Sequence, residues 1–488
     1  MAQPLQNSID LTMLAKQSML ERDLLPDFPP SALQEASRMT SPAQPQSSAI
    51  QDMRHLLWFS LDNETSKDLD QITYAERLDD QHFKIFIAIA DVDSLVKKET
   101  AIDGYAQYNT TSVYTPTKIF PMLPEKLSTN LTSLNEHEDR LAIIMEANIA
   151  IDGTQKHYAI YRGYVNNKAK LAYNSVSTWL DGIAPPPKQI EQIPELDEQI
   201  RLQDKIAGIL RQYRHQKGAL TLQTIEPYAI FEGPTIVDLK ATVKNRGRNL
   251  IEDFMIAANQ VTAYFLRDHR RPSLRRIVRT PKRWDRIIEI ARQYGTNLPL
   301  EPDAKALDLF LKQRYLLDPI HFPDLSLTII KLLGRGEYMV EYPGKPSIGH
   351  FSLAVKDYTH STAPNRRFPD LLTQRLIKAT LAHQSSPYSN HELEQLAQQC
   401  TEKEDDAEKV ERKMKKSAAC LLLSSKINQE FDALVTGAAP KGTWVRILAP
   451  PVEGKLIQGF EHVDVGDQIR VRLVHVDVLK GFIDFIRV

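Results

Sequence analysis

Short apolar runs separated by polar turns fill the first half of the chain, a pattern typical of β-strands. The clearest runs are LLWFSLD (56–62), FKIFIAIADVDSL (83–95), RLAIIMEANIAIDG (140–153) and HYAIYRGYV (157–165). Their lengths and turns predict a mixed or antiparallel sheet. Before them, residues 9–21 have the spacing of a short helix, and a linker rich in Pro, Ser and Gln follows.

Helical spacing dominates the second half, after a proline run at 185–187 that marks a loop. Apolar positions recur at helical intervals in four segments, 196–214, 249–269, 370–384 and 391–427. The chain then returns to strand character in DQIRVRLVHVD (467–477) and FIDFIRV (482–488). We therefore expect an α+β protein that ends in a small β-unit.

The last β-unit alternates Arg470 and Arg472 with apolar residues. Basic residues on one face of a small twisted barrel suit an OB fold that binds nucleic acid. An ordinary half-buried hairpin would show the same alternation, so this pattern alone does not choose between them.

Composition limits the class of protein. With 488 residues and 42% hydrophobic content, the chain can bury a large core and form two or three structural units. No apolar run approaches the ~20 residues that span a bilayer, and the start lacks the features of a signal peptide, so we expect a cytoplasmic protein. Cys400 and Cys420 are too few for a disulfide scaffold or a Cys-based zinc site, and we expect both to pack between helices.

The formal charge of −1 gives no global sign of a nucleic-acid binder. One local cluster stands out, because residues 268–287 hold eight Lys or Arg and two Asp. This cluster is either part of an RNA-binding surface or a solvated face of a helix.

Acidic residues supply the most informative chemistry. Asp62, Asp68 and Asp70 share one polar loop at the end of an apolar strand, and Asp91 and Asp93 follow the next strong strand. Carboxylates converging from a strand end and a neighbouring loop suit Mg²⁺, which prefers hard oxygen ligands. Two such ions ~3.5–4 Å apart activate a water and stabilise the leaving oxygen in phosphodiester cleavage.

A calcium EF-hand does not explain this loop. Counted from Asp62, Lys67 stands where the glycine is required and Thr73 where the bidentate glutamate is required, and counting from Asp68 fails at the same two requirements. A solvated loop whose Asp side chains cap its own turns remains open as the alternative.

Seven further segments continue in the order of a known family. After the spacing of Asp62, Asp68 and Asp70, the segments are IADV (89–92), TTSVYTPTKIFPMLPEKLSTNLTSLNEHEDRLA (110–142), KAKLAYNSVSTWL (168–180), GALTL (218–222), NLIEDFMIAAN (249–259), YTHSTAPNRRFPDLLTQRLIKA (358–379) and VERKMKKSAA (410–419). Together they resemble the ribonuclease II and ribonuclease R family of 3′-to-5′ exoribonucleases.

The resemblance implies three parts: an N-terminal helix and linker at 1–54, an RNB catalytic domain at 55–426, and an OB-fold RNA-binding barrel at 427–488. It also implies hydrolysis of single-stranded RNA from the 3′ end to 5′-mononucleotides, with Mg²⁺ or Mn²⁺ as the cofactor. The family's cold-shock domains have no counterpart in the residues before Asp62, so we expect a short form. Nothing in the sequence calls for more than a monomer.

Site residues follow from the same resemblance. Asp62, Asp68 and Asp70 would hold magnesium and orient the attacking water, with Asp68, Asp70 and Arg366 as the catalytic residues. Arg366, with Arg367 beside it, would hold the scissile phosphate, because a planar guanidinium meets phosphate oxygens in pairs. Without the family pattern, the two arginines would be a surface pair at a helix start.

Four more residues match the family's RNA channel. Tyr114 resembles the aromatic that clamps the 3′-terminal nucleotide, and Tyr173 the tyrosine that helps to distinguish ribose from deoxyribose. Glu252 matches a carboxylate near the terminal sugars, and Glu411 a glutamate in the channel. From the residues alone, the tyrosines would be half-buried packing residues, and Glu411 would pair with Lys415 along a helix.

Two residues depart from the family pattern. Gln71 stands where a second consecutive Asp is usual; its amide oxygen can ligate a metal but carries no charge, so metal affinity should fall. Leu222 replaces the aromatic partner of Tyr114, which should weaken the grip on the last bases. A catalytically weakened RNA-binding protein therefore remains the second hypothesis, and a DNA-directed nuclease is disfavoured by Tyr173 and Glu252.

Overall fold

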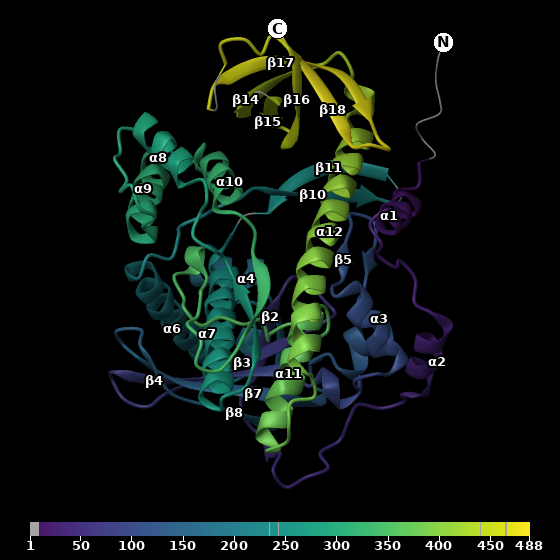
Figure 1. Cartoon of the computed structure of the whole chain (residues 1–488), viewed down its shortest axis with the longest axis vertical. Helices are drawn as coiled ribbons and strands as arrows, with labels where there is room; N and C mark the ends of the chain where they lie inside the picture. Colours follow the sequence, from purple (N-terminus) through teal and green to yellow (C-terminus); the bar gives the residue numbers. More distant parts are fainter. Residues whose placement is uncertain (1–8, 234, 243, 440, 464–465) are drawn as a thin grey trace.

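A seven-stranded sheet forms the lower part of the molecule (Figure 1). The computed structural model describes residues 9–233, 235–242, 244–439, 441–463 and 466–488. The strands follow the order β1-β8-β7-β4-β3-β2-β9, with antiparallel pairs inside and parallel pairs β1–β8 and β2–β9 at the edges. The predicted mixed sheet is confirmed. Its strands are β1 (Gln51–Asp52), β2 (Phe59–Asp62), β3 (Gln71–Arg77), β4 (His82–Ala90), β7 (Asp139–Ala150), β8 (Gln155–Asn166) and β9 (Ala169–Ala172).

Helices pack on this sheet and bury its apolar side chains. α7 carries buried apolar residues along much of its length and contacts β7 and β8. It begins earlier than its apolar pattern suggests, because the Asn245 side chain accepts the N–H of Arg248 and caps the helix. The helices of this layer are α4 (Tyr173–Leu180), α5 (Lys188–Gln192), α6 (Leu196–Gln216), α7 (Arg246–Asp268) and α11 (Phe368–Leu381).

The N-terminal segment packs on the rest of the chain. α1 (Leu11–Leu20) contacts α12, and α2 (Pro30–Arg38) contacts α3 (Ala101–Asn109). Two short strands, β5 (Val113–Tyr114) and β6 (Ile119–Phe120), pair beside them, and a π-helical turn occupies Lys126–Leu131.

A second group of helices has its own apolar core around Trp284, Phe310 and Phe322. It consists of α8 (Trp284–Gln293), α9 (Ala304–Leu317) and α10 (Phe322–Leu333). Strands β12 (Ser273–Ile277) and β13 (Glu337–Glu341) pair where the chain enters and leaves this group, and β10 (Glu226–Glu232) pairs with β11 (Thr235–Thr242).

The basic cluster at 268–287 divides between two roles. Arg275 in β12 is buried and pairs with Glu341 at 2.7 Å, and Arg276 pairs with Glu404 of α12. Lys282 and Arg283, before α8, are exposed. Part of the cluster therefore stabilises the fold, which the charge count alone did not reveal.

α12 (Asn390–Leu423) rises from the sheet to the C-terminal barrel (Figure 1). Ser389 and Glu392 form a capping box at its start, and both Cys400 and Cys420 are buried on it, as expected. The barrel is closed in the order β14-β15-β16-β18-β17, which confirms the predicted OB-like unit. Its strands are β14 (Glu430–Ala439), β15 (Gly442–Ile447), β16 (Val452–Gln458), β17 (Gln468–Asp477) and β18 (Phe482–Arg487).

Acidic residues of β14 face the two arginines of β17. Arg470 pairs with Asp432 at 2.8 Å and Arg472 with Glu430 at 2.9 Å, so the basic row is largely neutralised. The barrel also docks on α10, where both terminal nitrogens of Arg446 contact the carboxylate of Asp324 at 2.9 and 3.0 Å. Within the described residues, no helix is both long and apolar enough to cross a membrane.

Candidate active site

An ion pair between Asp70 and Arg366 lies at the centre of the candidate site. Asp70 immediately precedes β3, and its carbonyl accepts the Ala90 N–H at 3.0 Å, so the sheet fixes its position. Its carboxylate accepts the main-chain N–H of Asn365 at 3.1 Å and the Nε of Arg366 at 3.2 Å. The side chain of Asp70 is 2% exposed and that of Arg366 is 43% exposed. The carboxylate of the pair is therefore buried, while part of the Arg366 side chain is exposed.

Burial raises the pKa of Asp70 to about 7, while Arg366 opposes the rise and the nearby charge of Asp68 adds to it. A carboxyl with a pKa near neutral pH is present in both its protonated and its ionised forms there. Such a group suits a role in proton transfer, and a bound cation would favour its ionised form.

Asp68 and Asp62 extend the acidic group from Asp70. Burial also raises the pKa of Asp68, and the charge of Asp62 adds to this while Arg366 and a hydrogen bond from Tyr114 oppose it. Asp62 ends β2 and accepts the Asn63 N–H at 2.6 Å and the Ser66 hydroxyl at 2.8 Å. Asp62 therefore caps its own turn, as the alternative interpretation expected, and also lies close enough to Asp68 to affect it.

The three carboxylates have the donor chemistry that Mg²⁺ requires. No group of three or more His, Cys, Asp or Glu side chains in the described ranges forms a ready-made metal site. Asp68 nevertheless interacts electrostatically with Asp62 and with Asp70. Their oxygens are hard ligands, and a divalent cation would stabilise the ionised forms. Asp62, Asp68 and Asp70 are therefore the residues that would hold such an ion.

Tyr114 and Glu411 come together at the same site from opposite ends of the sequence. The Tyr114 main-chain N–H donates to Glu411 Oε1 at 2.8 Å, which joins β5 to α12. Burial raises the pKa of the Tyr114 hydroxyl, which lies near Arg366 and Asp68. Four residues predicted separately thus converge: Asp68, Tyr114, Arg366 and Glu411.

Tyr173 lies on the Asp62 side of the site. It begins α4, and burial raises the pKa of its hydroxyl, with the charge of Asp62 adding to the rise. The guanidinium of Arg248 lies over its ring, 4.8 Å from the centroid, and donates to the Asn63 amide oxygen at 2.6 Å. Sequence reasoning missed Arg248, although its place in NRGRNL, in the first turn of α7, was a usable signal.

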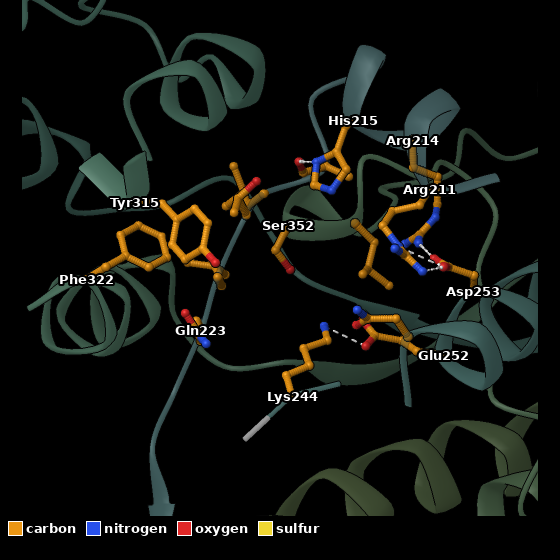
Figure 2. A pocket seen from close by; sticks show the side chains of 16 residues that line it. Arg211, Arg214, His215, Gln223, Lys244, Glu252, Asp253, Tyr315, Phe322 and Ser352 are labelled. Carbon is orange, nitrogen blue, oxygen red and sulfur yellow. Dashed lines mark hydrogen bonds and ion pairs between the residues drawn. The ribbon is translucent and has the colours of Figure 1, made fainter. Parts of the chain in front are cut away.

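Leu222 and Glu252 line a separate cavity of about 270 Å³ (Figure 2). Glu252 pairs with Lys244 at 2.6 Å, and Asp253 beside it is held by Arg211 and Arg214. Tyr315 and Phe322 lie across this cavity (Figure 2). The cavity lining does not include Asp70 or Arg366, so the structure divides the predicted residues between two neighbourhoods.

Arg367 and Gln71 lie next to Arg366 and Asp70 in the sequence but have other surroundings. Arg367 begins α11 as its N-cap and pairs with Asp370 at 2.7 Å, whereas Arg366 turns to Asp70. Gln71 is the first residue of β3, opposite Ile89 of β4, and is buried. Their predicted roles in RNA and metal binding remain predictions.

A groove of about 620 Å³ connects Tyr114 with the barrel. Its walls come from β5, the β10–β11 hairpin, α12 and the barrel strand β16. Arg412, Lys415 and Lys416 line it together with Tyr228, so it combines positive charge with an aromatic side chain. Lys415, predicted as the helical partner of Glu411, contributes to this groove.

Two known protein domains match most of this chain. The RNB domain profile matches residues 50–383, and the profile of the RNase II-type exonuclease C-terminal S1 domain matches residues 429–488. Ribonuclease R of Vibrio cholerae is 28% identical over 473 residues, which cover 89% of this chain and 56% of that protein. The chain therefore spans little more than half the length of this curated relative.

Solved structures share the fold at low sequence identity. Mycoplasma genitalium RNase R in complex with ribose methylated single-stranded RNA superposes with a TM-score of 0.87 at 22% identity, covering 99% of this chain and 79% of that one. Yeast Ssd1, described as a pseudonuclease, has a TM-score of 0.74 at 15% identity, covering 92% and 56%. Because the RNB domain profile covers well over half of its residues, this chain belongs to the RNB domain family.

Proposed function

We propose that this chain is a hydrolytic 3′-to-5′ exoribonuclease that degrades single-stranded RNA to 5′-mononucleotides and depends on Mg²⁺ or Mn²⁺. The observation that carries this proposal is the pairing of a buried Asp70 with a half-open Arg366. Membership of the RNB domain family and the ribonuclease R names of its relatives support the same activity.

Arg366 is suited to hold the phosphate. Asp70 engages its Nε at 3.2 Å and so orients the guanidinium, while the side chain keeps 43% of its surface exposed. The remaining N–H groups would donate to the phosphate oxygens and stabilise the charge that develops on them. Asp70 would orient the attacking water through its carboxylate, which a bound cation would keep ionised.

A divalent ion bound by Asp62, Asp68 and Asp70 would supply Lewis acidity at the scissile phosphate. The carboxylates contribute the hard oxygen ligands, and Gln71 contributes at most an uncharged one.

Aromatic residues would hold the RNA strand. The groove lined by Arg412, Lys415 and Lys416 leads to Tyr114, where a base would stack on the ring. Stacking contributes ~1–3 kcal/mol per base without regard to sequence. Tyr173, beside Asp62, would read the ribose nearest the scissile phosphate, and Glu252, in the separate cavity, would read a different ribose of the strand, since a hydroxyl and a carboxylate can each hydrogen-bond a 2′-hydroxyl. Leu222 offers no π-face, so we expect a looser grip than an aromatic residue would provide.

Digestion of end-labelled single-stranded RNA tests this function. With Mg²⁺ or Mn²⁺, 3′-labelled RNA should release labelled mononucleotide at once, while 5′-labelled RNA should shorten progressively. Asp70→Asn should abolish release and leave RNA binding largely intact. Normal hydrolysis by this variant would show that the site is assigned wrongly.

Two observations favour a second function, RNA binding with weakened catalysis. Gln71 supplies no charge next to Asp70, and the fold is also that of yeast Ssd1, described as a pseudonuclease. RNA binding without any shortening in the presence of either ion would support this second function. A matched comparison of RNA with DNA of the same sequence would show whether the ribose is required.

A further inference from the structure

A third cavity, of about 670 Å³, lies away from both neighbourhoods described above. It is enclosed by the second half of α11, strand β8 and the turn after residues 92–94, with Ile50 of the linker at one side. Asp93, which the sequence grouped with the acidic residues, lines this cavity and pairs with Lys378, whereas Asp62, Asp68, Asp70 and Arg366 do not line it.

Three cations of this cavity face only two carboxylates. Arg162 pairs with Asp91 at 2.9 Å, and Lys378 contacts Asp91 at 2.9 Å and Asp93 at 2.6 Å. Lys97 is held by the main-chain oxygen of Asp93 at 2.5 Å and lies 3.7 Å from its carboxylate. The group therefore carries one positive charge more than its acids neutralise.

Two further cations of the lining are already engaged in the fold. Arg375 is buried and bridges Asp93 and Asp103, and Lys98 contacts Glu392 and the ring of Tyr388. They do not add to the charge available to a ligand.

Lys97 is the most exposed of these three cations. Arg162 and Lys378 already neutralise Asp91, which has no exposed surface. Lys97 adds a third cation, and burial together with the charge of Lys378 lowers its pKa. Its side chain is 58% exposed and that of Arg162 is 30% exposed, so both can reach a ligand. An anion between them would relieve the repulsion.

The remaining wall of the cavity is mostly apolar. Ile50, Ala379, Leu381 and Pro387 line it. Its volume lies within the ~300–1,000 Å³ of typical small-molecule sites and exceeds what a single inorganic anion fills. A ligand with one phosphate and one flat ring would match both halves.

We propose that this cavity binds a nucleoside 5′-monophosphate, with its phosphate between Lys97, Arg162 and Lys378 and its base against the apolar wall. If the proposed function holds, this ligand is the product of the reaction, and the cavity is a product site outside the RNA path. The binding itself does not depend on catalysis.

α11 connects this cavity with the candidate active site. Arg366 stands just before the helix and Lys378 lies about 15 Å along it, at 1.5 Å per residue. Between them, the Gln374 amide donates to the Ala90 carbonyl at 2.8 Å and accepts the Asp93 N–H at 2.9 Å. Since the Ala90 N–H in turn holds the Asp70 carbonyl, the two sites share one hydrogen-bonded frame.

Calorimetric titration of the full chain with uridine 5′-monophosphate tests the proposal. The titration is done with saturating single-stranded RNA carrying a hydrolysis-resistant 3′ end, so that the RNA path is filled. Uridine and inorganic phosphate are titrated separately. We expect the monophosphate to bind in the presence of RNA, and each of the other two to bind at least tenfold more weakly.

Two variants localise the binding. Lys97→Met should weaken it tenfold or more, because a charge-assisted contact is lost. Ala382→Trp, at the exposed end of α11, should weaken it by filling the apolar half. Lys126→Met is the control, since Lys126 is also exposed and also donates to a main-chain oxygen, that of Ser37.

Several results would overturn the proposal: no binding, complete displacement by RNA, or unchanged affinity in Lys97→Met and Ala382→Trp. Equal affinity for inorganic phosphate would overturn the nucleotide assignment. A chain that failed to shorten labelled RNA but bound the monophosphate in this way would refute the proposed function and leave this site standing.

Discussion

The Arg366 side chain pairs with Asp70 and, under the proposed function, also binds the phosphate. Its Nε is held by a carboxylate with almost no exposed surface, while 43% of the side chain remains exposed. A lysine at this position would offer one compact ammonium, which cannot pair with Asp70 and receive a phosphate in the same planar geometry.

Arg366→Lys should therefore lower kcat for RNA shortening by about 10²–10³, the cost of removing one preorganised donor. KM should change much less, because the aromatic and basic contacts to the strand remain. Steady-state kinetics on a short labelled RNA measure both constants. The exposed Arg270→Lys is the control, and a kcat for Arg366→Lys within a few-fold of the native value would contradict this role.

Gln71→Asp should raise activity, because it adds a charged oxygen next to Asp70. The gain should be largest at low Mg²⁺, where occupancy of the metal limits the rate. Gln71→Asn, which keeps the amide, should show no gain. An equal rate for Gln71→Asp and the native chain at every Mg²⁺ concentration would mean that Gln71 does not limit catalysis.

Sequence reasoning identified most of the residues that meet at this site, and it could do so because their chemistry is carried by side chains. It did not identify Asn365, whose contribution to Asp70 is a main-chain N–H that any residue except proline would supply. It also could not show that Arg367 turns to Asp370 while Arg366 turns to Asp70, because adjacent arginines are equivalent in the sequence.

Among the elements, the β7–β8 hairpin depends on one glycine. Gly153 has φ +86°, and a Cβ there would lie 2.3 Å from the Tyr213 Cβ of α6. Gly153→Ala should lower the free energy of unfolding by roughly 2–3 kcal/mol, from backbone strain plus the clash. Gly182→Ala, with φ +72° and open space, should cost only about 1 kcal/mol. Urea denaturation compares the two, and equal losses would show that the clash is relieved elsewhere.

The segment between β13 and α11 carries a partly buried histidine, His350. Burial lowers the pKa of His350 to about 3, and the charge of Arg276 adds to this. Below about pH 6.5, His350 binds a proton in the unfolded chain. In the folded chain it stays neutral until the pH approaches 3. This histidine's contribution to stability is therefore complete above pH 6.5 and is lost as the pH falls from there toward 3.

His350→Asn should make stability fall less steeply between pH 6.5 and 4, by up to about 1.4 kcal/mol per pH unit. Denaturant unfolding at several pH values measures the slope. His391→Asn, at the exposed start of α12, should leave the slope unchanged. Identical slopes in the native chain and His350→Asn would contradict the assignment.

The long helices and the central strands of the sheet were predictable, because apolar periodicity determines which face is buried, but α8–α10 and the strands β10–β16 were not predicted. The pairing between strands was not predictable from the sequence. The alternation of Arg470 and Arg472 suggested a basic face, but the register that sets Asp432 and Glu430 opposite them depends on how the barrel closes. The periodicity of a sequence shows which face of one strand is buried, but it does not show which residues of a neighbouring strand lie opposite.

At the scale of the whole molecule, the barrel and the α8–α10 group are joined by Arg446 and Asp324. Asp324 is 4% exposed, so removing its partner would leave a buried carboxylate without compensation. Arg446→Met should cost about 3 kcal/mol and separate barrel unfolding from that of the RNB domain in calorimetry. Arg470→Met, which breaks an exposed pair, should cost less than about 1 kcal/mol. A single unshifted transition in Arg446→Met would show that the barrel is held by other contacts.

α12 has 34 residues and is about 50 Å long. Near its middle, Glu411 holds the backbone of Tyr114, and near its end the Cys420 thiol donates to the carbonyl of Phe482 in the barrel. One continuous helix thus carries both contacts, about 14 Å apart along its axis at 1.5 Å per residue. The helix therefore fixes the distance between Tyr114 and the barrel, and under the proposed function this distance would set the shortest RNA that reaches both.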